Sequence, residues 1–282
     1  MAGNNLEFVK IIKEWLSSNF EMKNMSEAAY ILGVKINGDH SRRLLSLSQE
    51  TYIRRILERF NMSDCKPMDT LISKGQTLSL EMCPKTPEEL KAMARVPYSS
   101  AIGSLMYAIM CTRPDICYDM GLVSKYQSNS GRKHWNAVKR IVAYLKGTAD
   151  YSLCCQGGEL HLIGYIDADG DGDLNERKST SGYVFLLSRS VISWSSKKQT
   201  CVDLSTIEAE YVACSAAVQE AVWLKRFTED LKIVTDSSRL VIIHCYSQAT
   251  ISFTKDAKYH SKSKHIETQY NFVREIVAQE KC

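Results

Sequence analysis

The pattern of apolar and polar positions divides the first part of the chain into short helices and strands. Residues 5–19 carry apolar side chains at helical spacing and predict an amphipathic helix. Residues 28–36 and 44–47 predict two strands joined by a polar turn, and residues 49–60 predict a second helix. The chain is therefore expected to begin with a helix, a hairpin and another helix.

The next hundred residues change from an irregular segment to helices. Residues 63–96 hold three of the five prolines and show little periodicity, which predicts an extended linker on the surface. Residues 98–126 are rich in Ala, Met, Leu and Tyr and predict two helices joined at Pro114. Residues 134–145 predict a third helix.

The last part of the chain predicts an α/β fold with a mixed sheet. Strands are expected near 161–167, 182–187 and 191–195, then a long helix from 206 and a strand at 240–245. Helices are expected near 248–254 and 265–279. The strand after the long helix can return parallel to the first one. These patterns predict four parts, namely 1–62, 63–96, 97–150 and 155–282.

The segment from His161 to Lys178 is the strongest candidate for metal chemistry. A short apolar strand leads directly to Asp167, and three more carboxylates follow it at alternate positions, namely Asp169, Asp171 and Asp173. Like charges this close repel one another unless a cation neutralises them or water surrounds them. The alternative is a polar turn between two strands.

Two metal sites fit this segment. In one, Asp167 is a carboxylate of a two-metal nuclease. In the other, residues 167–178 form an EF-hand calcium loop. The calcium hypothesis is the weaker one, because Lys178 occupies the position that requires a bidentate Glu and a strand-like run precedes the loop in place of a helix.

Further carboxylates lie on the predicted helices. Ser205 and Glu208 match a capping box, which gives Glu208 a structural role. Glu210 lies beside the apolar stripe of that helix and is the better candidate ligand, although a Glu in a first turn can simply offset the helix dipole. Glu267 is a later candidate, with a solubilising surface charge as the alternative. Where the strand 240–245 ends, the sequence has Tyr246 and no acid.

Composition narrows the class of protein without identifying a partner. The chain has 282 residues, 44% of them hydrophobic, and a net charge of +4, which is too small to prove a nucleic-acid partner. Its ten cysteines include no CxxC pair, which predicts reduced thiols and an intracellular protein, cytoplasmic or nuclear. No run of 18 uncharged apolar residues occurs, so neither a signal peptide nor a membrane span is expected.

Ordered motifs give the chain a family resemblance. Residues 161–275 contain YIDADGDGD, RKSTSGYVFLL, ISWSSKKQ, LSTIEAEYVA, EAVWL, CYSQATI and KHIETQYNFVRE. This series resembles the RNase H domain of copia-type LTR retrotransposons. Upstream, SLSQETYIRRILERFNM, YSSAIGSLMYAIMCTRPDI and HWNAVKRIVAYLKGT resemble the end of the same family's reverse transcriptase and its connection to RNase H.

The resemblance implies an RNase H-like mixed sheet with flanking helices. A mostly helical remnant of reverse-transcriptase palm, thumb and connection would precede it, and the hairpin of that remnant would expose apolar surface after losing its sheet partners. The family's acidic polymerase pair is missing, since no Asp-Asp occurs in the chain. Independent DNA synthesis is therefore not expected.

The resemblance also implies the site residues. The family's four catalytic acids fall on Asp167, Glu210, Tyr246 and Glu267, of which only the first two are kept. The family cleaves the RNA strand of an RNA–DNA hybrid with Mg²⁺, for which Mn²⁺ can substitute. Asp167, Glu210 and Glu267 would be the metal ligands. The changed positions imply impaired cleavage, and Gly170 replaces a family Trp.

Basic residues on both sides of Asp167 predict contacts with an RNA–DNA hybrid or another nucleic acid. The candidate phosphate-binding residues are Lys197, Lys198, Lys262, Lys264 and His265. The alternative is that they are solvated side chains on loops.

Overall fold

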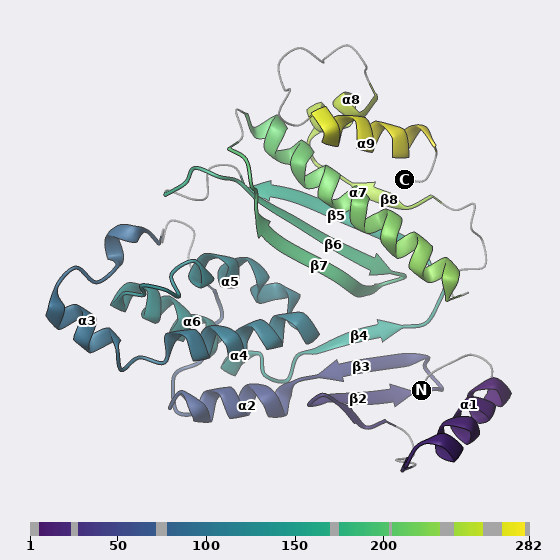
Figure 1. Ribbon diagram of the computed structural model, residues 1–282, viewed down its shortest axis with the longest axis horizontal. Coiled ribbons are helices and arrows are strands. Elements are labelled where there is room, and N and C mark those ends of the chain that lie inside the picture. Colours follow the sequence, from purple (N-terminus) through teal and green to yellow (C-terminus); the bar gives the residue numbers. More distant parts are fainter. Residues whose placement is uncertain are drawn as a thin grey trace.

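The computed structural model describes residues 6–23, 28–71, 78–169, 175–202, 205–231, 240–255 and 267–279. It has two four-stranded sheets, with a group of helices beside them and a long helix lying across the second sheet (Figure 1). The chain is thus a mixed α/β protein. Within the described ranges, no helix is both long and apolar enough to span a membrane.

The first sheet contains the expected hairpin. Helix α1 (Leu6–Asn19) precedes strands β1 (Tyr30–Ile31), β2 (Val34–Asp39) and β3 (Leu44–Ser48), and helix α2 (Glu50–Arg59) follows. The single strand predicted over 28–36 is broken, because Leu32 and Gly33 adopt positive φ angles of 50° and 80° and turn β1 back on β2. Sequence periodicity did not show this turn.

An unpredicted strand completes the first sheet. Strand β4 (Ser152–Gln156) pairs antiparallel with β3, from Leu44 opposite Gln156 to Ser48 opposite Ser152. The expectation that the hairpin had lost its sheet partners is therefore wrong at the β3 edge. Five residues with alternating burial give too weak a local pattern, and pairing with a strand a hundred residues away defines β4.

The helical part packs around one apolar core. It contains the 3₁₀ turns η1 (Leu80–Met82) and η2 (Pro114–Ile116) and helices α3 (Pro87–Met93), α4 (Tyr98–Cys111), α5 (Cys117–Ser124) and α6 (Arg132–Gly147). The predicted break at Pro114 is confirmed. The predicted linker is not wholly extended, because Thr86 and Glu89 form a capping box that starts α3. Fully buried core side chains come from α2, α4, η2 and α6, including Ile53, Leu105, Ile116, Ile141 and Leu145.

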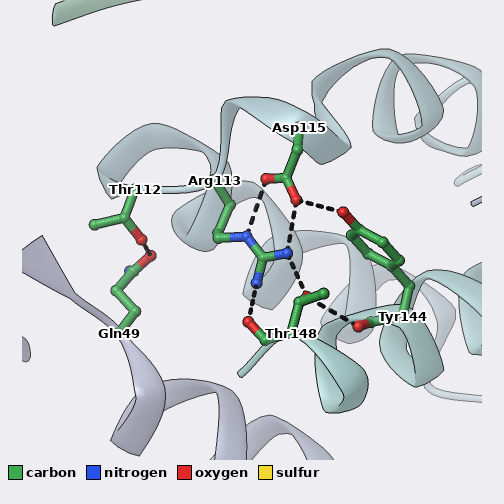
Figure 2. A network of polar contacts seen from close by, with 6 residues as sticks. All are labelled: Gln49, Thr112, Arg113, Asp115, Tyr144 and Thr148. Atoms are coloured by element: carbon green, nitrogen blue, oxygen red, sulfur yellow. Dashed lines mark hydrogen bonds and ion pairs between the residues drawn. The ribbon is translucent and has the colours of Figure 1, made fainter. Parts of the chain in front are cut away.

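A polar cluster crosses this helical core (Figure 2). The buried Arg113 guanidinium pairs with Asp115 and donates hydrogen bonds to Thr148 at the end of α6. Nearby, the Thr112 hydroxyl donates to the side-chain carbonyl of Gln49 at 2.7 Å, beside the start of α2. These contacts join segments that are far apart in the sequence.

The second sheet has the predicted mixed topology. Strands β5 (Leu162–Asp169), β6 (Thr180–Leu187), β7 (Ser190–Lys198) and β8 (Ile242–His244) lie in the order β7-β6-β5-β8, with β5 and β8 parallel and the other pairs antiparallel. Helix α7 (Thr206–Asp230) packs on β5 and β6, and α8 (Gln248–Lys255) and α9 (Glu267–Ala278) pack on α7 (Figure 1). Helix α5 contacts β7, so the helical part adjoins this sheet.

Candidate active site at the carboxyl end of strand β5

Several element ends meet at one edge of the second sheet. Because β5 and β8 are parallel, their carboxyl ends share that edge, where Asp167 ends up near the residues that follow β8. The start of α7 is held there by Gln199, whose side-chain amide donates to the Ser181 hydroxyl and to the Ala209 carbonyl, both at 2.8 Å. This buried glutamine places Glu210 over the same edge.

The structure brings Asp167 and Glu210 together. Burial raises the pKa of the half-buried Glu210 carboxyl, and the negative charge of nearby Asp167 raises it further. The backbone amide of Ala168 acts in the opposite direction on that pKa, and it also donates to Asp167 Oδ1 at 3.0 Å. Because burial and the charge of Asp167 both oppose ionisation of Glu210, a cation between the two carboxylates would be stabilising.

The residues after β8 supply no third carboxylate. Cys245 lies close enough for Glu210 and Asp167 to raise the pKa of its thiol, in addition to the larger effect of burial. Tyr246 is 87% exposed, so its ring extends into solvent instead of packing against its neighbours. The position that the family resemblance assigns to an acid therefore presents a phenol to water.

The fourth assigned position lies at the start of a helix. Glu267 is the first residue of α9, which packs against α7 and α8. Its side chain lies outside the described part of the structure, as do Lys262, Lys264 and His265. The metal-ligand assignment of Glu267 and the phosphate contacts of those three residues thus stay predictions.

Asp169 is held by the helical part of the chain. The hydroxyl of Tyr118, on α5, donates to Asp169 Oδ2 at 2.7 Å. Burial raises the pKa of Tyr118, and this hydrogen bond and the charge of Asp169 raise it further. Asp169 is therefore engaged with α5, while Gly170, Asp171 and Asp173 lie outside the described residues.

The geometry disfavours the calcium loop. Asp167 and Asp169 both lie within β5, where an EF-hand would need a loop that follows a helix. Lys178 forms an ion pair with Glu176 at 3.0 Å, and Lys198 forms another with the same carboxylate at 2.7 Å. The ammonium groups of Lys178 and Lys198 would repel a calcium ion at the end of the 167–178 segment.

Among the described residues, Asp167 and Glu210 supply the two carboxylates at this edge of the sheet. Carboxylate oxygens are the ligands that Mg²⁺ prefers, and Asp167 and Glu210 would hold it. In the part of the chain that the structure describes, no group of three or more His, Cys, Asp or Glu side chains is arranged to hold a metal.

The two adjacent lysines of β7 differ in their surroundings. Lys197 is exposed, whereas Lys198 is paired with Glu176, whose pKa is lowered by Lys198 and Lys178. Successive residues of a strand point to opposite faces, so the two ammonium groups do not form one patch.

The sequence patterns did not predict two residues that hold parts of the candidate site in place. Tyr118 and Gln199 act through contacts with Asp169 and Ala209, and nothing in their local sequence indicates these partners. The predicted helix cap is confirmed in part, since Ser205 Oγ accepts from the Glu208 amide at 3.3 Å.

Comparison with known proteins supplies the family. The fold and the site define a mixed α/β protein with two carboxylates near the end of a strand, which does not by itself fix a function. No protein-family model matches the chain. It is 46% identical over 280 residues, 99% of its length, to the "Retrovirus-related Pol polyprotein from transposon TNT 1-94" of Nicotiana tabacum, covering 21% of that protein.

Two Arabidopsis thaliana proteins extend the comparison. The "Retrovirus-related Pol polyprotein from transposon RE2" is 34% identical over 98% of this chain, which covers 18% of it. The "Uncharacterized mitochondrial protein AtMg00810" is 31% identical over 79% of this chain and 89% of its own length. The chain corresponds to a fragment of the retrovirus-related Pol polyproteins from transposons, and it spans about a fifth of the length of the named polyproteins.

Proposed function

We propose that residues 155–282 form an RNase H-like domain of copia-type descent that binds nucleic acid but cleaves RNA–DNA hybrids poorly. The remaining residues are a palm, thumb and connection remnant without polymerase activity. The observation that carries the proposal is the meeting of Asp167 and Glu210 at the shared end of the parallel strands β5 and β8, where Tyr246 provides no carboxylate.

The proposed impairment follows from the number of ligands. A two-metal site activates water with one ion and stabilises the leaving oxygen with the other. Asp167 and Glu210 would hold a single Mg²⁺ or Mn²⁺, and Tyr246 cannot replace a carboxylate ligand. If the missing ligand and the longer Glu267 together remove roughly 4 kcal/mol of transition-state stabilisation, the rate falls about a thousand-fold.

Hybrid cleavage with Mg²⁺ or Mn²⁺ tests this proposal. The chain is compared with Tyr246→Asp, Glu267→Asp and the double variant, and the double variant is expected to cleave best. Tyr30→Asp is a matched control, because it adds the same charge at another exposed tyrosine. Cleavage by the unmodified chain at the rate of the double variant, abolished by Asp167→Asn, would refute the impairment.

Nucleic-acid binding is the part of the proposal that does not need catalysis. Lys197 is the better phosphate contact of its pair, because Lys198 shares the carboxylate of Glu176 with Lys178. Affinity for an RNA–DNA hybrid should be independent of sequence and should fall steeply with salt. A titration in low salt that detects no salt-dependent binding would contradict this part.

A further inference from the structure

Helix α6 presents a basic face to solvent. It contains five Lys or Arg residues and no Asp or Glu. At about 100° per residue, its exposed polar positions fall within an arc of about 120°. They are Arg132, Lys133, Asn136 and Lys139. The opposite side is buried in the helical core through residues that include Val138, Ile141 and Leu145.

Some of these cations already have structural partners. Arg140 donates to the carbonyl oxygen of Leu71 at 2.8 Å and to the Thr70 hydroxyl at 2.7 Å, and Lys146 donates to the Cys65 carbonyl at 2.6 Å. These two residues hold the segment after α2 against α6. Arg132, Lys133 and Lys139 have exposed side chains.

Helix α2 extends the same surface. The ring of Trp135, on α6, contacts the ring of Phe60 with a centroid separation of 6.5 Å and an edge-to-face geometry. The Arg59 guanidinium lies over the Phe60 ring, 5.7 Å from the ring centroid. Arg59 is thereby placed beside the edge of α6 that carries Arg132 and Lys139.

The charge of this surface selects a polyanion. Arg132 and Lys139 are seven residues apart, a rise of about 10 Å along the helix. That length corresponds to about three phosphate steps along one strand of a duplex, at about 3.4 Å of axis per phosphate. Two carboxylates lie near this surface, Glu81 in η1, which contacts α6, and the exposed Glu58 beside Arg59.

We propose that Arg59, Arg132, Lys133 and Lys139, here called the α6 basic face, form a second nucleic-acid-binding surface that contacts the phosphate backbone of a duplex. This inference rests on the proposed nucleic-acid binding of the chain, but it places a separate contact on the helical part. The proposed contacts are with phosphates, which position a protein on a duplex without reading its sequence.

The test measures how affinity for a fluorescein-labelled RNA–DNA hybrid depends on salt, by fluorescence anisotropy on the full chain. The variant is Arg132→Gln, Lys133→Gln, Lys139→Gln. Log affinity falls as log salt rises, and removing three phosphate contacts should make this negative slope shallower by about two to three. Binding at about 50 mM salt should weaken about tenfold. The matched control is Lys10→Gln, Lys13→Gln, Lys23→Gln, which removes the same charge from exposed positions in and after α1.

Each outcome decides between the two proposals. A loss of slope in the α6 variant but not in the control supports the second surface. Unchanged binding by the α6 variant, with weakened binding by Lys197→Ala, overturns the second surface and leaves the proposed function standing. Absence of salt-dependent binding by the unmodified chain overturns both. Equal urea midpoints of both triple variants verify that folding is unchanged, since all six positions are exposed.

Discussion

Arg113 is the charged side chain whose removal should most affect the helical part. It is 2% exposed, and its guanidinium forms a bidentate pair with Asp115, Nε to Oδ1 at 2.9 Å and Nη2 to Oδ2 at 2.7 Å. It also donates to the Thr148 carbonyl at 3.1 Å and to the Thr148 hydroxyl at 2.6 Å (Figure 2). The perturbation is Arg113→Met, which keeps most of the apolar stem and removes the charge.

The expected cost follows from the groups left behind. Removing one partner of a buried ion pair costs about 3–5 kcal/mol, because the other charge stays buried without compensation. The Asp115 side chain is 33% exposed and keeps the Tyr144 hydroxyl at 2.9 Å, so water and that bond recover part of the loss. The free energy of unfolding should therefore fall by about 2–4 kcal/mol.

A second substitution tests the mechanism. Burial acts to raise the pKa of Asp115, but the hydrogen bonds and charge of Arg113 outweigh it and lower that pKa. Asp115→Asn in the Arg113→Met background removes the stranded charge, so the double variant should be more stable than the sum of the single effects by about 1–3 kcal/mol. This coupling separates an electrostatic cause from a packing cause.

The assay is urea unfolding followed by tryptophan fluorescence, because Trp135 packs against the same core, with circular dichroism as a second probe. Arg54→Met is the control, since the exposed Arg54 pairs with Glu50 across one helical turn and should contribute at most about 0.5 kcal/mol. An Arg113→Met variant within about 1 kcal/mol of the unmodified chain would refute the reasoning.

Three further predictions concern single contacts. Burial lowers the pKa of His134 below 6.5, so its contribution to stability is complete above pH 6.5 and declines as pH falls through the folded pKa; urea midpoints should show that slope, and His134→Gln should remove it. Gly131→Ala should cost about 1–3 kcal/mol, because an added Cβ would lie 1.9 Å from the Met82 carbonyl oxygen, whereas Gly103→Ala, with open space, should be neutral or stabilising; equal thermal midpoints would contradict this. Tyr118→Phe should cost about 1 kcal/mol and speed amide hydrogen exchange at Asp169; unchanged exchange would argue against the contact.

The sequence predicted the second sheet better than the first. Strong apolar runs and a 25-residue helix gave β5 to β8 and α7 their order, and the parallel return of β8 followed from a general rule of connection. Strand β4 was missed because its five residues gain their conformation from β3, and no local pattern encodes that pairing. The turn at Leu32 was missed because a non-glycine residue adopts the left-handed region only in its tertiary context.

The candidate site was likewise predicted only in part. Asp167 and Glu210 were predictable because each follows a strong local pattern, a strand end and a capped helix start, that fixes its place in the fold. The engagement of Asp169 was not predictable, because Tyr118 lies 51 residues away on a helix whose sequence shows no polar pattern toward the sheet. The separation of Lys197 from Lys198 likewise depends on Glu176, which reaches β7 from another segment.

The helical part contacts the residues on both sides of the segment 170–174. Before it, Asp169 accepts from Tyr118 on α5; after it, Asn175 Oδ1 accepts from the Leu80 amide at 3.1 Å, and its amide nitrogen lies 3.2 Å from the Tyr126 hydroxyl. The Tyr126 ring stacks on the buried His134 of α6 at 3.8 Å, so this anchor belongs to the helical core. A chain that keeps only residues 155–282 would lose both anchors. The helical part therefore anchors Asp169 and Asn175, the described residues on the two sides of that segment.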